Sequence, residues 1–227
     1  MAIISSRHNA LIKRVREAIR EHRDEIVLEG PKAVADAIAG GWNVIAKIER
    51  GLDVTNEVFD SLTETRSPQD VIGLFERPRV DATQILAQRD RIAIALDGVQ
   101  DPGNVGTIIR LAAAFDAAGV LLLPGCADPF GPKAIRSSAG AILTTPVASI
   151  TSHELRDTNL VAADMHGAAI DPPSRDAVLV FGNEGSGVSA ELLARATKIA
   201  IPMSGRVESL NVASSAAILL ARSFVLR

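Results

Sequence analysis

The chain has 227 residues, of which 47% are hydrophobic and 22% charged, so it can bury a sizeable core and is not expected to be disordered. Its formal net charge of −3 argues against a generally basic protein that binds any polyanion. The charge is unevenly placed, because residues 1–23 hold six basic and two acidic side chains. This local excess predicts either a focused contact with an anion or simply a solvated helix face.

Cys126 is the only cysteine, which excludes a disulfide framework or a cysteine metal cluster within one chain and fits a reducing cytoplasm. The four histidines are scattered without zinc-ligand spacing, so no metal is expected. The first residues lack the apolar core of a secretory signal, and no uninterrupted apolar stretch is long enough to span a membrane. We therefore expect a cytoplasmic protein with no membrane contact.

Residues 1–78 predict a small α/β domain. An amphipathic helix over residues 9–19 is followed by a strand at 25–30, a helix that begins at Pro31, a strand at 44–48, a short helix at 58–62 and a strand at 71–75. Residues 79–90 are polar and marked by Pro78, and they hold only a weak helical pattern. This stretch is expected to be a linker between two domains.

From residue 91 onward, short apolar strands alternate with helices. Strands are expected at 92–96, 120–123, 159–163, 177–181 and 198–201. Helices are expected after the polar loop at 97–106 and at 133–141, 190–196 and 212–226. The continuous apolar character of residues 92–96 is typical of a strand that is buried on both faces. The pattern predicts a parallel sheet covered by helices over residues 91–227.

Three polar loops lie where an apolar strand gives way to a helix, at residues 97–106, 182–187 and 201–211. This position is the usual ligand-binding edge of an open α/β sheet. Neither a phosphate-binding loop with its lysine nor a dinucleotide fingerprint is present, and Glu184 would repel phosphate. A ligand with hydroxyls or positive charge fits better. The alternative is ordinary helix capping by Asn104, Ser209 or Asn211 and a glycine-rich connection at 182–187.

Together these stretches resemble the SpoU (TrmH-like) family of RNA ribose 2′-O-methyltransferases in the SPOUT superfamily. The first family motif is similar to residues 102–106 with Arg110, the second to residues 180–187, and the third to residues 201–203 with 209–213. Residues 133–140 also resemble a family segment. A weaker resemblance covers the N-terminal domain, where residues 9–13, 28–30 and 67–69 are similar to the family's ribosomal-protein-L30e-like substrate-binding domain.

The resemblance implies a C-terminal trefoil knot, an obligate homodimer and S-adenosylmethionine as the methyl donor. It implies that the 2′-hydroxyl of an RNA ribose is methylated, with ribosomal RNA favoured over transfer RNA. Asp116 and Ala221 depart from the usual family residues but do not touch the implied chemistry. A non-catalytic RNA-binding or assembly protein that retains the fold remains an alternative, whereas an oxidoreductase lacks its fingerprint.

The implied site residues fall into three groups. Catalytic roles are implied for Arg110, Asn104, Glu184, Ser209 and Asn211. Cofactor contacts are implied for Leu123, Pro124, Gly125, Gly182, Asn183, Gly185, Ile201, Pro202, Met203 and Leu210. Contacts with RNA are expected from Lys13, Arg14, Arg16, Arg20, Lys133 and Arg136. Because a guanidinium has a pKa above about 12, the central arginine is expected to orient the 2′-hydroxyl and its phosphate rather than act as a base.

Overall fold

A computed structural model describes residues 3–21, 23–63, 69–169 and 173–225 of the chain. The chain divides at Pro78/Arg79 into two compact units, residues 1–78 and 79–227. Each unit has its own sheet and its own buried core, so the two are described separately.

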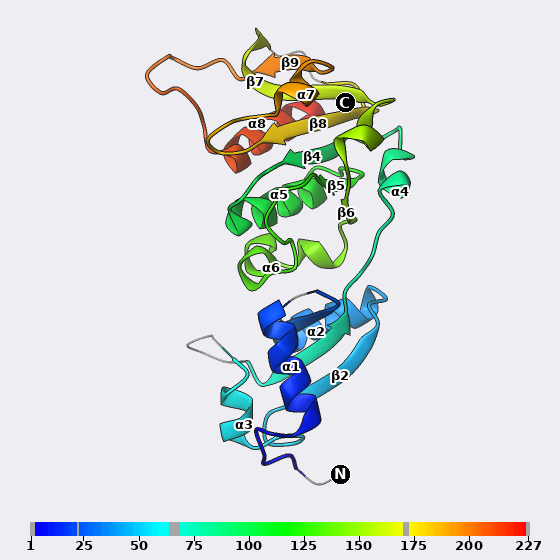
Figure 1. The fold of residues 1–227 in the computed structure, drawn as a ribbon, viewed down its shortest axis with the longest axis vertical. Coiled ribbons are helices and arrows are strands. Elements are labelled where there is room, and N and C mark those ends of the chain that lie inside the picture. The colour runs from blue at the N-terminus through cyan, green and yellow to red at the C-terminus, as the bar shows by residue number, and fades with distance from the viewer. Residues whose placement is uncertain (1–2, 22, 64–68, 170–172, 226–227) are drawn as a thin grey trace. The chain divides into compact units, whose positions relative to one another are not determined.

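The N-terminal unit is a three-stranded antiparallel sheet in the order β1-β3-β2 (Figure 1). One side of α1 packs Ile12 and Val15 into a core that also holds Phe59 and Leu74. The Asn9 side chain accepts a hydrogen bond from the Leu11 amide at 2.9 Å and thereby starts the helix. The elements are α1 (Ala10–Glu21), β1 (Glu25–Glu29), α2 (Pro31–Ala39), β2 (Val44–Glu49), α3 (Asn56–Asp60) and β3 (Val71–Glu76).

Part of the sequence resemblance in this unit lies outside the described residues. The stretch 67–69 begins within residues 64–68, and only Gln69 is described. The Gln69 amide donates a hydrogen bond to the Glu29 carboxylate at 3.0 Å, next to the end of β1. This contact places the start of β3 beside the Leu28–Gly30 segment of the same resemblance.

The expected linker at residues 79–90 is instead built into the C-terminal unit. It contains α4 (Ala82–Leu86), which is capped by Asp81 through a 2.9 Å hydrogen bond from the Thr83 amide. Ala82 and Ile85 are buried in the core of the C-terminal unit. The helical sequence pattern of α4 was weak because a five-residue helix places only two apolar side chains in the core.

The C-terminal unit is a six-stranded, fully parallel sheet in the order β6-β5-β4-β8-β7-β9. This confirms the predicted parallel α/β architecture. The strands are β4 (Ala93–Asp97), β5 (Gly119–Leu122), β6 (Val147–Ser149), β7 (Asn159–Ala169), β8 (Ala177–Gly182) and β9 (Thr197–Ala200). The three-residue strand β6 was not predicted from sequence, and β7 extends six residues beyond its predicted end.

Helices cover both faces of this sheet (Figure 1). The short helices α4 and α7 (Ala190–Leu193) contribute to the core on one face, together with Ala95, Leu121 and Val180. On the other face α5 (Pro102–Ala114) packs against β5 and α8 (Val212–Val225), and α8 also packs against β8. A further helix, α6 (Pro132–Ser138), packs onto α5. The helical turns at Ala141–Leu143 and Ser152–Leu155 were not predicted.

The close packing of α5 on α6 depends on Gly106. A Cβ atom at this position would clash with the backbone carbonyl of Ala134, and that backbone cannot rotate away as a side chain would. The contact fixes α5, and therefore the loop that precedes it, against the rest of the unit.

We predict that Gly106→Ala destabilises the protein, although alanine is normally favoured over glycine in a helix by about 1 kcal/mol. Overpacking against the α6 backbone should outweigh this gain and lower the free energy of unfolding by about 1–3 kcal/mol. Urea denaturation followed by circular dichroism measures the change. Ala113→Gly, at an exposed position of the same helix, is the control for helix propensity. A neutral or stabilising Gly106→Ala would contradict the packing argument.

Candidate functional site

The first loop begins α5 with Asp101 as the cap, and not with Asn104. The Asp101 carboxylate accepts a hydrogen bond from the Asn104 amide at 3.0 Å and another from Lys133 Nζ at 2.6 Å. The hydrogen bond from Lys133 is the largest cause that lowers the pKa of Asp101. Capping by Asp101 leaves the Asn104 side chain free for other contacts.

The second loop, residues 182–187, closes on itself. The backbone of Asn183 and Gly187 exchanges hydrogen bonds of 3.0 and 2.9 Å, and a Cβ on Gly182 would clash with the Gly187–Val188 backbone. The Asn183 side-chain oxygen accepts from the Gly185 amide at 2.8 Å, and its nitrogen donates to the Gly98 carbonyl at 2.8 Å. The loop is therefore held in shape and tied to the first loop.

The third loop ends where α8 begins, and Asn211 is the cap. Its side-chain oxygen accepts from the Ala213 amide at 2.9 Å and from the Ser214 amide at 3.3 Å. Ser209, which the sequence offered as an alternative cap, lies in the exposed segment before the helix.

Hydrogen bonds between side chains join the three loops. Asn211 Nδ2 donates to Asn104 Oδ1 at 3.1 Å, and Asn104 Nδ2 donates to Glu184 Oε1 at 2.9 Å. The Glu184 carboxylate also accepts from the backbone amides of Gln100 and Asp101, at 3.3 Å each. We call Asn104, Glu184 and Asn211 the Asn-Glu-Asn cluster. Residues separated by about a hundred positions in sequence meet at this one edge of the sheet.

The pKa of Glu184 is lowered although its carboxyl group is partly desolvated. Desolvation is the largest single influence and raises the pKa, but the hydrogen bonds from Asn104 and from backbone amides together outweigh it. Glu184 is therefore an ionised acceptor at neutral pH, and its role in the cluster is to hold donors in place.

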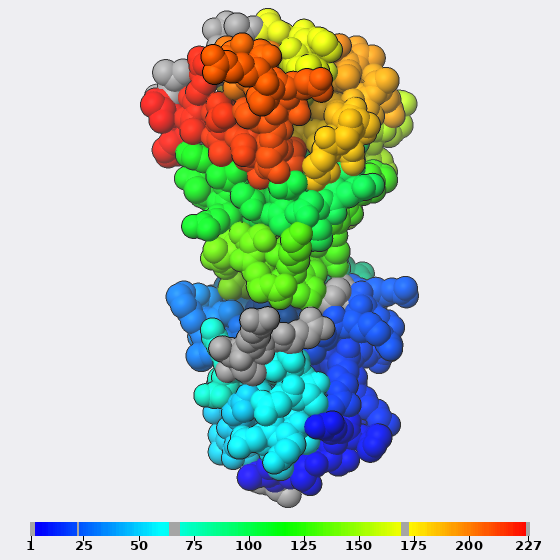
Figure 2. Space-filling view, turned by 90° about the vertical axis from the view of Figure 1, so that its left-hand side faces the viewer, coloured from blue at the N-terminus to red at the C-terminus, as the bar shows by residue number. Residues whose placement is uncertain are grey.

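A cavity of about 640 Å³ opens beside the Asn-Glu-Asn cluster. Its walls come from the middle of β7, where pairing with β9 is interrupted, from the loop after β8 and from the segment from β9 to α8. Figure 2 shows the orange residues that follow Ile201 at the surface, next to the gold residues of the 182–187 loop. The lining residues relevant below are Asp164, His166, Phe181, Leu193, Ile199, Glu208, Ser209 and Leu210.

Most of the expected cofactor residues meet at this cavity. Those that line it are Gly182, Asn183, Gly185, Ile201, Met203 and Leu210, together with Glu184, Ser209 and Asn211 from the expected catalytic group. Pro202 lies between two lining residues without lining the cavity itself. Asn104 joins the site through its hydrogen bonds to Glu184 and Asn211.

The structure does not bring Leu123, Pro124 or Gly125 to the cavity. They follow β5, which lies on the far side of β4 from β8, and Leu123 is buried in the core. Ala163–His166 of β7 also line the cavity, although no site role was predicted for them from sequence. These residues could have been predicted from sequence, because β7 is another parallel strand and the residues after its apolar start reach the same carboxyl edge of the sheet.

Arg110 is exposed on α5, whereas Ile108, two residues earlier, is buried. It makes no hydrogen bond or ion pair with any residue that the structure describes, and it does not line the cavity. Its guanidinium is therefore available to a molecule outside the protein.

The expected RNA-binding residues of the N-terminal unit are engaged to different degrees. Arg14 pairs with Glu25 and Arg20 pairs with Glu21, whereas Lys13 is exposed without a partner among the described residues. Arg16 donates to the Ser61 hydroxyl at 2.7 Å and to the Arg7 carbonyl at 3.1 Å, so no carboxylate neutralises it there.

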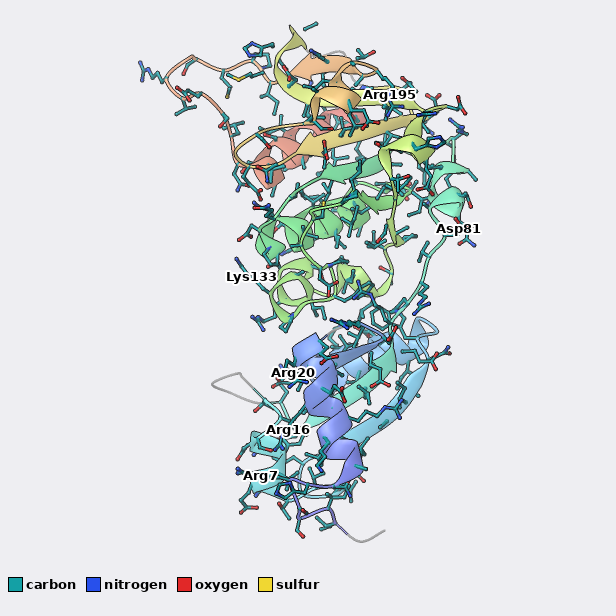
Figure 3. The ribbon with its side chains drawn as sticks, viewed as in Figure 1. Arg7, Arg16, Arg20, Asp81, Lys133 and Arg195 are labelled. Carbon is teal, nitrogen blue, oxygen red and sulfur yellow. The ribbon has the colours of Figure 1, made fainter. Side chains whose placement is uncertain are left out.

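Arg7, Arg16 and Arg20 lie along one side of α1 (Figure 3). Lys13 shares that side because helical residues three, four or seven apart point in similar directions. Arg14 lies about 100° away around the helix. In the C-terminal unit, Lys133 is tied to Asp101 and Arg136 is exposed.

Within the described ranges, no helix is long and apolar enough to cross a membrane. No group of three or more His, Cys, Asp and Glu side chains among those residues is arranged to hold a metal ion.

We predict that Glu184→Gln lowers the free energy of unfolding by about 1 kcal/mol at pH 7, which is below the usual contribution of hydrogen bonds to a charged group because Glu184 is exposed. Since the folded-state pKa of Glu184 is lowered, its contribution is complete above the unfolded-state pKa and is lost as the pH falls through the folded-state value. Urea denaturation at pH 7 and below pH 4 should show a difference between wild type and variant that shrinks in acid. A difference that grows in acid would refute the assignment.

Comparison with known proteins gives the family. Residues 91–221 match the SpoU rRNA Methylase family. The chain is 33% identical over 215 residues to the 23S rRNA (guanosine(2553)-2′-O)-methyltransferase RlmP of Bacillus subtilis, covering 88% of this chain and 84% of that protein.

Solved structures agree over nearly the whole chain. An AdoMet-bound rRNA methyltransferase from Sinorhizobium meliloti has a TM-score of 0.87 and 30% identity, with 98% of this chain and 97% of that chain covered. The SpoU methyltransferase AviRb from Streptomyces viridochromogenes, in complex with the cofactor AdoMet, has a TM-score of 0.84 and 25% identity, with 96% and 98% covered. The sequence resemblance is thus confirmed, and the chain belongs to the SpoU rRNA methylase family.

Proposed function

We propose that this protein transfers a methyl group from S-adenosylmethionine to the 2′-hydroxyl of a ribose in ribosomal RNA. The observation that carries the proposal is the Asn-Glu-Asn cluster beside a cavity of about 640 Å³ at the carboxyl edge of the sheet. Family membership supports it, as do relatives named as 23S rRNA 2′-O-methyltransferases and structures solved with AdoMet.

The cavity fits this cofactor chemically. Phe181, Leu193, Ile199 and Leu210 offer apolar surface to an adenine ring, while the backbone of the 182–187 loop offers polar groups. Neither Lys nor Arg is among the described lining residues, so the cavity suits a cationic ligand better than a dinucleotide with its phosphates. When bound, S-adenosylmethionine supplies a methyl group activated by the positively charged sulfur.

The chain's own residues then have to position the ribose. The 2′-oxygen attacks the methyl carbon as the carbon–sulfur bond breaks, and the hydroxyl proton passes to solvent. Arg110 binds the phosphate next to the target ribose and polarises the 2′-hydroxyl, since a guanidinium cannot serve as a base. Glu184 fixes Asn104 and Asn211 instead of taking the proton, because its pKa is lowered and several donors already occupy it. Ser209 and Asn211 contact the methionyl part or the ribose.

The trefoil knot and the homodimer belong to the same proposal. β9 lies at the sheet edge beyond β7, yet α8 packs against β8 and α5, so residues 201–211 cross back over the carboxyl edge of the sheet. Threading of α8 through a loop of the chain is consistent with this path. Ile218, Phe224 and Val225 of α8 expose apolar surface that a second copy would cover.

We assign RNA binding to the ribosomal-protein-like unit at residues 1–78, with further contacts from Lys133 and Arg136. The exposed basic side chains of α1 support this assignment. The cytoplasm, where ribosomes assemble, is the proposed location. Transfer RNA as the substrate, or RNA binding without catalysis, would appear as distinct outcomes of the methylation test below.

We predict that Arg110→Ala slows methyl transfer by two to three decades, since a cation aimed at a phosphate and a developing alkoxide contributes about 3–4 kcal/mol to lowering the barrier. Arg110→Lys should restore only part of the rate, because an ammonium lacks the bidentate fork. Single-turnover transfer of labelled methyl onto ribosomal and transfer RNA, with mapping of the modified nucleotide, measures both.

Calorimetric titration of S-adenosylmethionine should show unchanged affinity for Arg110→Ala, because Arg110 does not line the cavity. Arg156→Ala, an exposed arginine after the Ser152–Leu155 turn, is the control and should keep full activity. Turnover of Arg110→Ala within about threefold of wild type would remove Arg110 from the mechanism. Cofactor binding without transfer to any RNA would favour the non-catalytic alternative.

We further predict that the double variant Lys13→Glu, Arg20→Glu weakens RNA binding and flattens its dependence on salt, because fewer counterions are released. Both side chains are exposed, so the fold should be unaffected. The double variant Lys32→Glu, Lys47→Glu reverses two exposed charges on α2 and β2 and is the control matched in charge. Filter binding at several salt concentrations decides the matter, and equal affinity of variant and control would mean that this face of α1 is merely solvated.

A further inference from the structure

We propose that Asp164 and Glu208 make the cavity selective for the positively charged methyl donor over its neutral product, S-adenosylhomocysteine. The inference rests on the proposed function, because it takes the cavity to be the S-adenosylmethionine site. It assigns to two residues a role in donor choice and product release that the sequence motifs did not indicate.

The charges around the cavity are of one sign. Asp164, Glu184 and Glu208 line it, and neither lysine nor arginine is among the lining residues that the structure describes. Glu184 already accepts hydrogen bonds from Asn104 and two backbone amides, which leaves its charge largely compensated. The other two carboxylates therefore dominate the electrostatic potential that a ligand meets.

Asp164 is held in place with one oxygen to spare. It follows Ala163, at the point where β7 departs from regular pairing with β9, and its Oδ1 accepts a hydrogen bond from the His166 amide at 2.7 Å. Its second oxygen has no partner among the described residues. The turn thus fixes a partly buried carboxylate at the wall of the cavity.

Glu208 lines the cavity from a different part of the chain, the exposed segment that precedes α8. It makes no hydrogen bond or ion pair with any other described residue. Its side chain can therefore orient toward a bound cation without losing an existing contact.

The reaction changes the ligand's charge. S-adenosylmethionine carries a sulfonium, an ammonium and a carboxylate, for a net charge of +1. Once the methyl has moved to the 2′-oxygen and the hydroxyl proton has left, the sulfur is a neutral thioether and the net charge is zero. The attraction between the sulfonium and the carboxylates of Asp164 and Glu208 is therefore absent in the product. As a result, the product binds more weakly than the methyl donor and leaves more readily.

The test is calorimetric titration of the full-length protein with S-adenosylmethionine, S-adenosylhomocysteine and sinefungin, whose amine keeps a positive charge near the sulfonium position. Wild type should bind the two cationic ligands more tightly than the neutral one. Asp164→Asn and Glu208→Gln should each reduce this preference by a factor of up to about five, the size of an exposed ion pair. Salt of about 0.5 M should reduce the wild-type preference in the same direction.

Asp157→Asn is the matched control, because it removes the same charge from an exposed turn just before the start of β7. It should leave the preference unchanged. If Asp164→Asn and Glu208→Gln weaken all three ligands equally, or change none, the proposed selectivity is refuted. Glu208→Gln lies in an exposed segment and keeps the test valid even if Asp164→Asn unfolds. Failure of the wild type to bind any of the three would instead refute the proposed function.

Discussion

The hydrogen bonds of the Asn-Glu-Asn cluster are the constraint on which the site depends. One carboxylate, Glu184, accepts from the Asn104 side chain and from the backbone before α5, while Asn104 in turn accepts from the cap of α8. The cluster therefore fixes the starts of both long helices relative to the loop after β8. Because these groups are satisfied by one another, this part of the cavity wall is formed before any ligand arrives, and its ordering costs binding little conformational entropy.

This constraint is possible only because β4 and β8 are adjacent and parallel, so that their carboxyl ends meet. Asp97 at the end of β4 accepts a hydrogen bond from the Ser189 amide at 2.7 Å, which ties the first loop to the far side of the second. Asn183 reaches back to Gly98, whose φ of 68° favours glycine. The adjacent parallel strands thus bring the two loops close together, and hydrogen bonds from short polar side chains fix the relative positions of the loops.

The architecture, and the gathering of many expected site residues around one cavity, could be predicted from sequence. The same reasons explain what was missed. Continuous apolar strands and the loops that follow them identify the ligand edge of a parallel sheet, and the family resemblance then implied site roles for Glu184 and Asn211 within those loops. Strand order is not written in local sequence. The loop at Leu123–Gly125 looks equivalent to the others, yet β5 lies beyond β4, away from the cavity. Asp164 escaped notice because β7 continues to Ala169 past the apolar run that marks its start.

The distribution of charge explains why Arg110 lies outside the cavity. A methyl donor with a net positive charge favours a negatively charged site, whereas an RNA backbone with many negative charges favours a positively charged one. A cavity that contains three carboxylates cannot also attract phosphate. Cations for RNA therefore have to stand beyond its rim, and Arg110 on α5 and Arg136 on α6 are exposed in this way. Lys133 is partly neutralised by Asp101, which suits a role in holding the first loop. Under the proposed function, the RNA would be anchored through its phosphate outside the cavity while the 2′-hydroxyl alone reaches in, so that geometry, and not a strong base, would carry most of the catalysis.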